Sequence, residues 1–328
     1  MITILGDGAW GTAIATVLAE NNHDVLLWCF DQEVLESIKE TRTNKCYLPD
    51  VKLPGNIHAT SDLCEAMKSE IIFQAIPVKY LRSVLSRCKE HSEENQTWVS
   101  LSKGIENETF LFPTEIIRSV LGKNIKCVAV SGPSYAIEIA KKAPTIVTIA
   151  GKDSKVTKKI KELLQTDFLL TEISKDVIGT ELGGAVKNVF ALGIGILDGA
   201  GYGPNTQVRL MMQAIKEIKL LIQNFGGKES SFYNSSGIGD FVLTSFFETS
   251  RNRQVGQMIG EGKKLETILK DTGLPFEALA KKGYTAEGVN SVRSFCELSS
   301  QNKLNLPIIK TIYEIIFKNG TAKKLAEL

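Results

Sequence analysis

The feature that most constrains this chain is a glycine-rich turn close to its N-terminus. Residues 2–5 are an aliphatic and β-branched run typical of a strand, and residues 12–20 have the pattern of a helix. Between them, Gly6, Gly8 and Gly11 follow the G-x-G-x-x-G spacing. In that context the first glycine permits a tight turn, the second admits a pyrophosphate, and the third allows close helix packing. The turn therefore predicts dinucleotide binding; a tight turn without a ligand is the alternative.

The expected cofactor contacts of this turn are Gly6, Gly8, Ala9, Trp10 and Gly11, because a helix N-terminus offers unpaired N–H donors to phosphates. A second apparent strand, residues 24–29, ends at Phe30 and Asp31. Asp31 lies about 20 residues beyond the turn, where an acid accepts from the ribose of NAD and an arginine would favour NADP. The alternative is that Asp31 caps the helix at 32–42, while Phe30 is placed to flank the adenine. The cofactor is thus NAD or NADP, with a lean towards NAD.

Length and composition narrow the class of protein. A chain of 328 residues predicts about two domains. Hydrophobic content of 43%, charged content of 23% and a net charge of +2 are typical of a soluble protein without a nucleic-acid partner. The six cysteines show no metal-type spacing, which indicates a reducing compartment and no metal. The chain opens on a core strand, and we expect no signal peptide and no membrane span, hence a cytoplasmic protein.

The chain changes character near residue 178. Before it, continuous apolar strands alternate with helices, which predicts an α/β fold with a doubly wound, mainly parallel sheet of the Rossmann type over residues 1–178. Residues 47–55 are expected to form a loop. After residue 178 we find only helical patterns, so residues 179–328 are predicted to form an all-α domain. The expected helices there are 181–199, 206–225, 238–248, 252–261, 264–270, 285–299 and 308–318.

Two further turns follow strands, at the edge where open α/β sheets bind ligands. Lys103 follows the strand at 97–101, where its cation would face a cofactor or an anionic substrate. A surface lysine is the simpler explanation when this residue is taken alone. The second turn, SGPSYA, follows the strand at 126–130 and contains Gly132, Ser134 and Ala136.

The helical half opens with a stripe of small and polar residues. Gly184, Lys187, Asn188, Ala191 and Gly195 share one face of the helix expected at 181–199. Each glycine inside a helix costs about 1 kcal/mol relative to alanine, so several together suggest close approach of another backbone or of a ligand. A partly desolvated lysine near other cations can serve in proton transfer, because its pKa falls towards neutrality.

Two later motifs complete the candidate site. Asp240 and Thr244 are spaced to share one face of a helix, and Asp240 is placed to hold a lysine ammonium. The alternative is that Asp240 is simply an acid in the first turn of a helix, where it interacts favourably with the helix dipole. Ser250, Arg251 and Asn252 precede another helix, where guanidinium, amide and N–H groups suit a phosphate. Capping of that helix by Ser250 or Asn252 alone is the alternative.

In combination these motifs resemble the soluble NAD(P)-dependent sn-glycerol-3-phosphate dehydrogenases. The resemblance rests on GDGAWGTAIA, SLSKGIE, SGPSYAIEIA, ELGGAVKNVFALGIGILDGAGYGPN, GIGDFVLT, TSRNR and AEGVNS, in this order along the chain. It implies reversible reduction of dihydroxyacetone phosphate to sn-glycerol 3-phosphate, which supplies the phospholipid backbone. It further implies a homodimer, without stable membrane insertion, and an active site in the cleft between the two domains.

The resemblance also implies individual roles. The residue matching the general acid/base is Lys187, and those around the reacting centre are Lys103, Asp240 and Thr244. The residues that match the family's substrate contacts are Lys103, Gly132, Ser134, Lys187, Asn188, Asp240, Ser250, Arg251 and Asn252. Of these, Arg251 and Asn252 match the site that binds the substrate phosphate. The residues that match the family's cofactor contacts are Lys103, Ala136, Arg251 and Glu287, in addition to the glycine turn, Phe30 and Asp31.

The chain departs from the family pattern at two places. Gln213 and Ala214 stand where the family usually has arginine and glycine, and Arg209 lies one turn earlier. Phe30 stands where many bacterial members have arginine. The first departure concerns helix packing or dimer contacts, and the second concerns cofactor preference.

Two other functions remain compatible with the residues. One is a related dehydrogenase acting on a hydroxy acid or sugar acid, because a carboxylate also fits beside Arg251. The other is a redox sensor that binds a dinucleotide without catalysis. The presence of Lys187, Asp240 and Lys103 argues against a sensor, because a sensor needs no proton donor.

Overall fold

The computed structural model describes residues 1–270 and 287–328 and divides the chain into two compact units. The first unit comprises Met1–Lys103 and Phe112–Glu181, and the second comprises Gly104–Leu111 and Leu182–Leu328. The segment 104–111 thus interrupts the first unit in sequence and belongs to the helical one, where Ser294 Oγ lies 2.5 Å from Asn107 Oδ1. The predicted division at residue 178 assigns residues 104–111 to the first domain, whereas the structure groups them with the helical unit.

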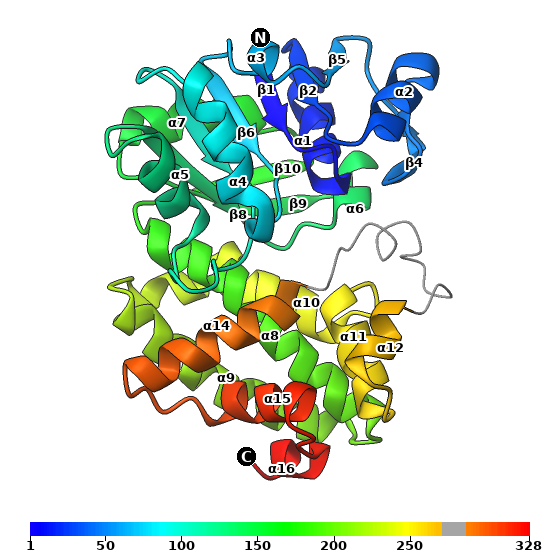
Figure 1. Cartoon of the computed structure of the whole chain (residues 1–328), viewed down its shortest axis with the longest axis vertical. Coiled ribbons are helices and arrows are strands. Elements are labelled where there is room, and N and C mark those ends of the chain that lie inside the picture. The colour runs from blue at the N-terminus through cyan, green and yellow to red at the C-terminus, as the bar shows by residue number, and fades with distance from the viewer. Residues whose placement is uncertain (271–286) are drawn as a thin grey trace. The chain divides into compact units, whose positions relative to one another are not determined.

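The first unit is built on an eight-stranded sheet with the order β10-β9-β8-β7-β6-β1-β2-β5 (Figure 1). All neighbouring strands run parallel except β8 and β9. The predicted α/β class with a mainly parallel sheet is confirmed. The strands are β1 (Ile2–Leu5), β2 (Val25–Trp28), β5 (Ile57–Thr60), β6 (Ile71–Gln74), β7 (Thr97–Ser100), β8 (Lys126–Ser131), β9 (Thr145–Ala150) and β10 (Leu169–Ser174).

The sheet differs from the expectation in the direction of its last two strands. The alternation of apolar strands with helices suggests a parallel order up to residue 178, but β9 is antiparallel to β8, and β10 runs parallel to β9. The residues between β8 and β9 hold only the short helix α6 (Ala136–Ala140). An antiparallel pair needs no long crossover, and a buried apolar strand carries no signal of its direction.

The expectation of a loop at 47–55 is wrong in part. A two-stranded antiparallel ribbon forms there from β3 (Thr43–Asn44) and β4 (Leu48–Lys52). Pro49 lies exposed in β4. Proline is tolerated in an edge strand because its missing N–H faces away from the partner strand.

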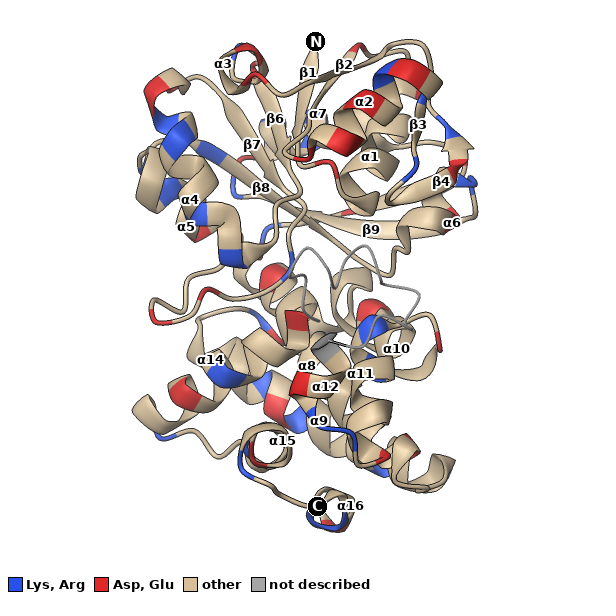
Figure 2. Cartoon of the chain, turned by 45° about the vertical axis from the view of Figure 1, so that its right-hand side comes forward, with Lys and Arg blue, Asp and Glu red and all other residues tan. Residues whose placement is uncertain are grey.

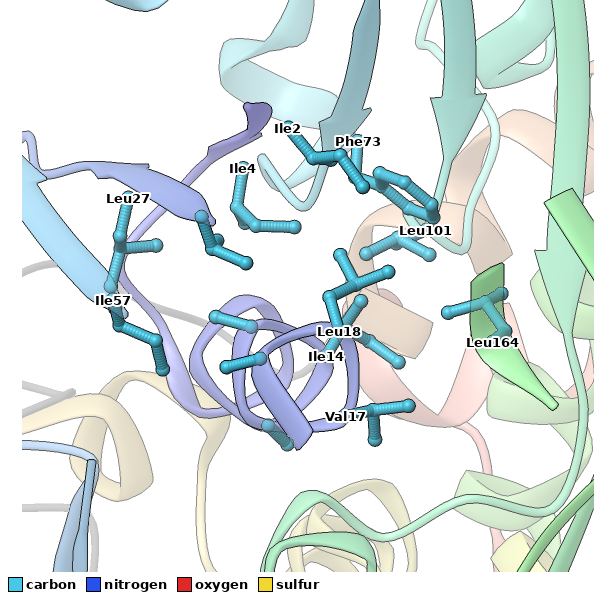
Figure 3. Packing of buried hydrophobic residues seen from close by; sticks show 14 of the residues in the cluster. Ile2, Ile4, Ile14, Val17, Leu18, Leu27, Ile57, Phe73, Leu101 and Leu164 are labelled. Atoms are coloured by element: carbon cyan, nitrogen blue, oxygen red, sulfur yellow. The ribbon is translucent and has the colours of Figure 1, made fainter. Parts of the chain in front are cut away.

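Helices cover both faces of the sheet. Ile4 of β1 belongs to the apolar cluster around α1 (Ala9–Glu20), whereas the neighbouring Thr3 donates to Ala66 O of α3 (Leu63–Ala66) at 2.8 Å. Alternate residues of a strand point to opposite faces. Figure 3 shows Ile14 and Leu18 of α1 within the first cluster. The remaining helices of this unit are α2 (Gln32–Thr41), α4 (Val78–Cys88), α5 (Pro113–Leu121) and α7 (Ser154–Leu164).

The described part of the second unit is helical, as predicted. The short turns η2 (Glu229–Tyr233) and η3 (Ser235–Gly239, a π-helical turn) and the C-terminal α16 (Ala322–Glu327) were not expected. The start of the helix predicted at 285–299 lies outside the described residues. The other helices are α8 (Val177–Gly199, from the end of the first unit), α9 (Pro204–Asn224), α10 (Asp240–Phe246), α11 (Arg251–Gly260), α12 (Leu265–Lys270), α14 (Glu287–Gln301) and α15 (Pro307–Phe317).

Helix α8 bears on the expectation that the chain has no membrane span. By length and composition alone, this helix is long and apolar enough to cross a bilayer. However, 94% of its apolar window is buried inside the protein, as in the core helix of a soluble protein. A helix that is hydrophobic all round and covered by protein is a core element.

Helices α8 and α11 touch through reciprocal glycines. A Cβ added at Gly195 of α8 would overlap the Arg253 carbonyl of α11, and one at Gly256 of α11 would overlap the Leu192 carbonyl of α8. Gly199 and Gly260 repeat the arrangement one turn further on. Small residues four apart let two helix backbones approach closely. This contact supplies the reason for Gly195, one of the two glycines of the stripe.

Two buried glutamates bind helix N-termini. Glu181 accepts from Thr114 N at 2.9 Å at the start of α5, and Glu217 accepts from Ile308 N at 2.6 Å and Ile309 N at 3.2 Å at the start of α15. The positive end of the helix dipole favours a carboxylate there. Burial nevertheless dominates, and it raises the pKa of Glu181 and that of Glu217 to about 7.

Replacement of Gly195 by alanine tests the helix contact. Helix propensity alone would stabilise the variant by about 1 kcal/mol, whereas overlap with the Arg253 carbonyl should destabilise it by about 1–3 kcal/mol. We expect a lower urea midpoint for Gly195→Ala. Gly55→Ala is the control, because a Cβ there meets nothing within 4 Å. A higher midpoint for Gly195→Ala would contradict the close contact.

The buried Glu217 should make stability depend on pH. Its pKa rises from 4.5 to about 7 on folding, so its contribution is present below pH 4.5 and lost as pH rises through about 7. Between about pH 5 and 8 we expect the Glu217→Gln variant to gain about 1–3 kcal/mol relative to the wild type. Urea unfolding across this range measures the gain. The exposed Glu94→Gln variant should follow the wild type, and parallel curves for all three proteins would contradict the assignment.

Candidate active site

The glycine turn has the geometry that its spacing predicts. Gly6 has φ of 120°, which favours glycine, and a Cβ there would lie 3.0 Å from the Ala75 carbonyl. A Cβ at Gly11 would overlap the Gly6 carbonyl, so the helix starts directly against the turn. Around Gly8, by contrast, a Cβ would meet nothing within 4 Å. The turn is tight at its first and third glycines and open at its second.

The start of α1 offers donors to an anion. Gly8 is the N-cap of this helix and provides no side-chain cap, so the first N–H groups, beginning with Ala9, keep their donor capacity. The indole nitrogen of Trp10 is buried without a hydrogen-bond partner in the described part of the protein. Open space beside uncapped N–H groups fits a pyrophosphate. Cofactor binding by these residues stays a prediction.

Asp31 serves as a helix cap. Its Oδ1 accepts from Glu33 N at 3.0 Å at the start of α2, which confirms the alternative reading of this acid. Its own N–H donates to Asp7 Oδ2 at 2.8 Å. Phe30 is 71% exposed, and its ring centroid lies 6.2 Å from that of Trp28. A contact of Asp31 or Phe30 with adenosine remains a prediction.

The turns after β7 and β8 meet at one carbonyl group. Lys103 Nζ and Ser134 Oγ each donate to Gly132 O at 2.9 Å. A Cβ at Gly132 would lie 2.8 Å from the Ile146 carbonyl, so the turn requires glycine. Ala136 begins α6 directly afterwards. The residues predicted from the two turns are thus brought together at the carboxyl ends of these strands.

In the second unit the structure brings Lys187, Asp240 and Thr244 together. Lys187 Nζ donates to Asp240 Oδ1 and, at 2.8 Å, to Thr244 Oγ1. Lys187 is 6% exposed and Asp240 is 1% exposed. A buried charge is tolerated when it is paired and hydrogen-bonded. The predicted role of Asp240 as the partner of a lysine ammonium agrees with this geometry.

Local structure explains how the three side chains meet. Lys187 projects from the middle of α8, and Asp240 is the first residue of α10, with Thr244 one turn later on the same face. The π-helical turn η3 leads directly into α10 and packs on α8, where a Cβ at Gly183 would lie 2.6 Å from the Ser236 carbonyl. Gly183 precedes Lys187 by one helical turn, so close approach at the glycine brings Asp240 within reach of the lysine.

A second cluster forms around Asn252. Its Nδ2 donates to Asn188 Oδ1 at 2.9 Å, and its Oδ1 accepts from Gly288 N at 3.0 Å. Asn188 Nδ2 in turn donates to Glu287 Oε2 at 3.4 Å. The cluster joins α8, the start of α11 and the start of α14. It brings together three predicted site residues whose proximity the sequence did not reveal.

The start of α11 is capped by Ser250, whose Oγ accepts from Arg253 N at 3.4 Å. This confirms the capping alternative for Ser250. Arg251 is exposed as the first residue of the helix. A role of Ser250 and Arg251 in binding substrate remains a prediction.

Sequence reasoning missed two arginine contacts. Arg253 Nη2 donates to Asp198 Oδ2 at 2.7 Å and ties α11 to the end of α8. The only signal for it was the second arginine of the TSRNR run. Arg209 donates to the carbonyls of Ala326 and Glu327 at 3.3 and 2.9 Å, so it binds the end of α16. Ala214, at the same departure from the family pattern, is fully buried.

Comparison with known families adds independent evidence. The model of the NAD-dependent glycerol-3-phosphate dehydrogenase N-terminus matches residues 1–157, and that of the C-terminus matches residues 176–327. The chain belongs to this family. The two models match the sheet-containing part and the helical part of the chain in turn.

Individual relatives agree with this family membership. The chain is 39% identical to the glycerol-3-phosphate dehydrogenase [NAD(P)+] of a Thermoanaerobacter species over 97% of this chain and 92% of the relative. It is 37% identical to that of Bacillus pumilus over 97% and 90% of the two chains. The crystal structure of the glycerol-3-phosphate dehydrogenase from Coxiella burnetii is similar with a TM-score of 0.90 and 28% identity, covering 99% and 97% of the two chains.

The buried pair predicts non-additive effects on stability. Asp240→Leu leaves the Lys187 ammonium buried without its carboxylate, which should cost about 3–5 kcal/mol. Lys187→Met strands the carboxylate in the same way. The double variant Lys187→Met/Asp240→Leu removes both charges, and we expect it to recover most of the loss. A double-mutant cycle from urea unfolding measures the coupling. Additive losses would contradict a buried pair.

Proposed function

We propose that this protein catalyses the reversible reduction of dihydroxyacetone phosphate to sn-glycerol 3-phosphate with NADH or NADPH. The family models support the reaction class, and the relatives at 37–39% identity bear the name of this activity. The single observation that carries the proposal is the buried Lys187 ammonium, held by Asp240 and Thr244. Such a group provides the proton that a carbonyl reduction requires.

The chemistry assigns a role to this lysine. When bound, a reduced nicotinamide would supply a hydride, which is a proton with two electrons, to C2 of the ketone. Charge then develops on the C2 oxygen, and Lys187 donates a proton to that atom, which gives the hydroxyl group of the product. In the reverse direction the neutral amine accepts the proton. Asp240 and Thr244 orient the Nζ atom for both directions, and Lys103 adds positive charge near the developing alkoxide.

The polar groups of the helical unit suit the phosphate end of the substrate. Arg251 offers a fork of donors at the exposed start of α11. Asn252 is held by Asn188 and by Gly288 N, which fixes the start of the helix beside the lysine's helix. We propose that Ser250, Arg251 and Asn252 bind the phosphate, and that Asn188, Gly132 and Ser134 make further substrate contacts.

In the first unit, we propose that the dinucleotide binds at the glycine turn. Gly6, Gly8, Ala9, Trp10 and Gly11 would hold its pyrophosphate. Phe30 and Asp31 would hold its adenosine, and Lys103, Ala136, Arg251 and Glu287 would complete its contacts. The open side of Gly8 and the uncapped start of α1 support this assignment. The acid at Asp31 favours NAD.

Family membership supports a proposal about the cellular setting. We propose that the protein acts in the cytoplasm as a homodimer and that its product feeds phospholipid synthesis. The protein has a soluble dehydrogenase fold whose apolar α8 lies in the core. No metal is needed for the proposed reaction, because Lys187 supplies the proton directly.

A cofactor-oxidation assay tests the reaction. With dihydroxyacetone phosphate we expect loss of NADH or NADPH absorbance, and with unphosphorylated dihydroxyacetone almost none. Lys187→Ala should lower kcat by about 10²–10⁴ because the proton donor is lost, while the Kd for the dinucleotide stays nearly unchanged. Lys216→Ala, at an exposed position of α9, is the control and should keep wild-type turnover.

The opposite results are equally clear. A folded wild-type protein that binds the dinucleotide but reduces no dihydroxyacetone phosphate would refute the proposed substrate. Equal loss of turnover and of cofactor binding in Lys187→Ala would refute the role of this lysine in proton transfer.

A further inference from the structure

Asp7, the second residue of the glycine turn, has a contact that the G-x-G-x-x-G spacing does not require. The pairing of β1 with β2 places Leu5 opposite Trp28, and Gly6 N donates to Trp28 O at 3.2 Å. The next residue therefore lies beside the chain that leaves β2. Asp7 is 6% exposed, and its Oδ2 accepts from Asp31 N at 2.8 Å.

The N–H groups at the end of β2 are bound by carboxylates of the chain itself. Asp7 binds the N–H of Asp31, and Asp31 Oδ1 binds the N–H of Glu33. These groups form the start of α2, where backbone donors and the helix dipole would otherwise attract an anion. A 2′-phosphate on the adenosine ribose would need such donors, because the ribose lies at this end of β2 in dinucleotide-binding folds.

The charged side chains that follow β2 directly along the chain are acidic, whereas nearby cations come from elsewhere: Arg87 of α4 lies 6.0 Å from the Trp28 ring centroid, and Lys39 lies in the last turn of α2. Asp7 and Asp31 are followed by Glu33 in the first turn of α2, and residues 25–36 contain neither lysine nor arginine. Figure 2 shows acidic residues along α2. The dianionic 2′-phosphate of NADPH would meet two carboxylates, whereas the 2′-hydroxyl of NADH carries no charge and can donate to one.

We propose that Asp7 is a specificity-determining residue that selects NADH over NADPH. It acts in two ways: its charge repels the 2′-phosphate, and its hydrogen bond occupies the Asp31 N–H that the phosphate would use. The inference rests on the proposed function only in so far as the cofactor is a nicotinamide dinucleotide. It differs from the role expected of Asp31, because Asp7 lies in the phosphate-binding turn and not at the end of β2.

Equilibrium binding of NADH and NADPH, without substrate, tests the proposal. Asp7→Asn removes the charge and keeps an oxygen acceptor for Asp31 N, whereas Asp7→Ala removes both. The matched control is Asp24→Asn, which makes the same change of charge at an exposed position before the other end of β2. Quenching of tryptophan fluorescence gives each Kd, and kcat/KM for the two cofactors gives a second readout.

We expect the wild type to bind NADH more tightly than NADPH. Asp7→Asn should shift the affinity ratio towards NADPH by about tenfold, and Asp7→Ala by at least as much, since it also releases the Asp31 N–H. Asp24→Asn should leave the ratio within about twofold. The isosteric asparagine variant decides the question even if the alanine variant does not fold.

Three results would overturn the proposal: a wild-type preference for NADPH, an Asp7→Asn ratio within about twofold of the wild type, or an equal shift in Asp24→Asn. Failure of the proposed function has a different signature. If the protein shows the expected cofactor ratios but reduces no dihydroxyacetone phosphate, the role of Asp7 in cofactor selection is supported and the proposed substrate is refuted.

Discussion

The buried contact between Lys187 and Asp240 is the interaction on which the helical unit depends. An ammonium and a carboxylate removed from water are tolerated only if their hydrogen bonds are satisfied, which demands exact positions from α8 and α10. The glycines of α8 provide those positions. Gly183 lets the turn before Asp240 approach, and Gly195 lets α11 lie against the same helix. The close contacts of α8 thus fix both the carboxylate partner of Lys187 and the start of α11.

The first unit solves a different problem, which is to hold a turn rigid while one of its faces stays open. The apolar residues of α1 lie in the core against β1 and its neighbours (Figure 3), so the start of this helix cannot drift. Gly6 and Gly11 lock the turn from within, and the space beside Gly8 remains clear. Rigid backbone donors need no rearrangement when an anion arrives.

Features carried by local spacing could be predicted from the sequence. The glycine turn, the helical second half and the shared face of Asp240 and Thr244 all depend on residues close together in the chain. Contacts between distant segments could not be read in this way. Asn252 meets Asn188, and Arg253 meets Asp198, only because α11 packs on α8. The direction of β9 escaped prediction for the same reason, since its residues report burial and not orientation.

The helical unit also includes residues 104–111, which are synthesised well before the rest of that unit. Residues 104–111 emerge in the middle of the first unit, yet Ser294, with which Asn107 pairs, is made close to the end of the chain. This pairing cannot form until almost all of the protein has been synthesised, although domains otherwise tend to fold in turn from the N-terminus. A fragment that begins at Leu182 would lack part of its own unit. The two units therefore do not correspond to two continuous stretches of sequence.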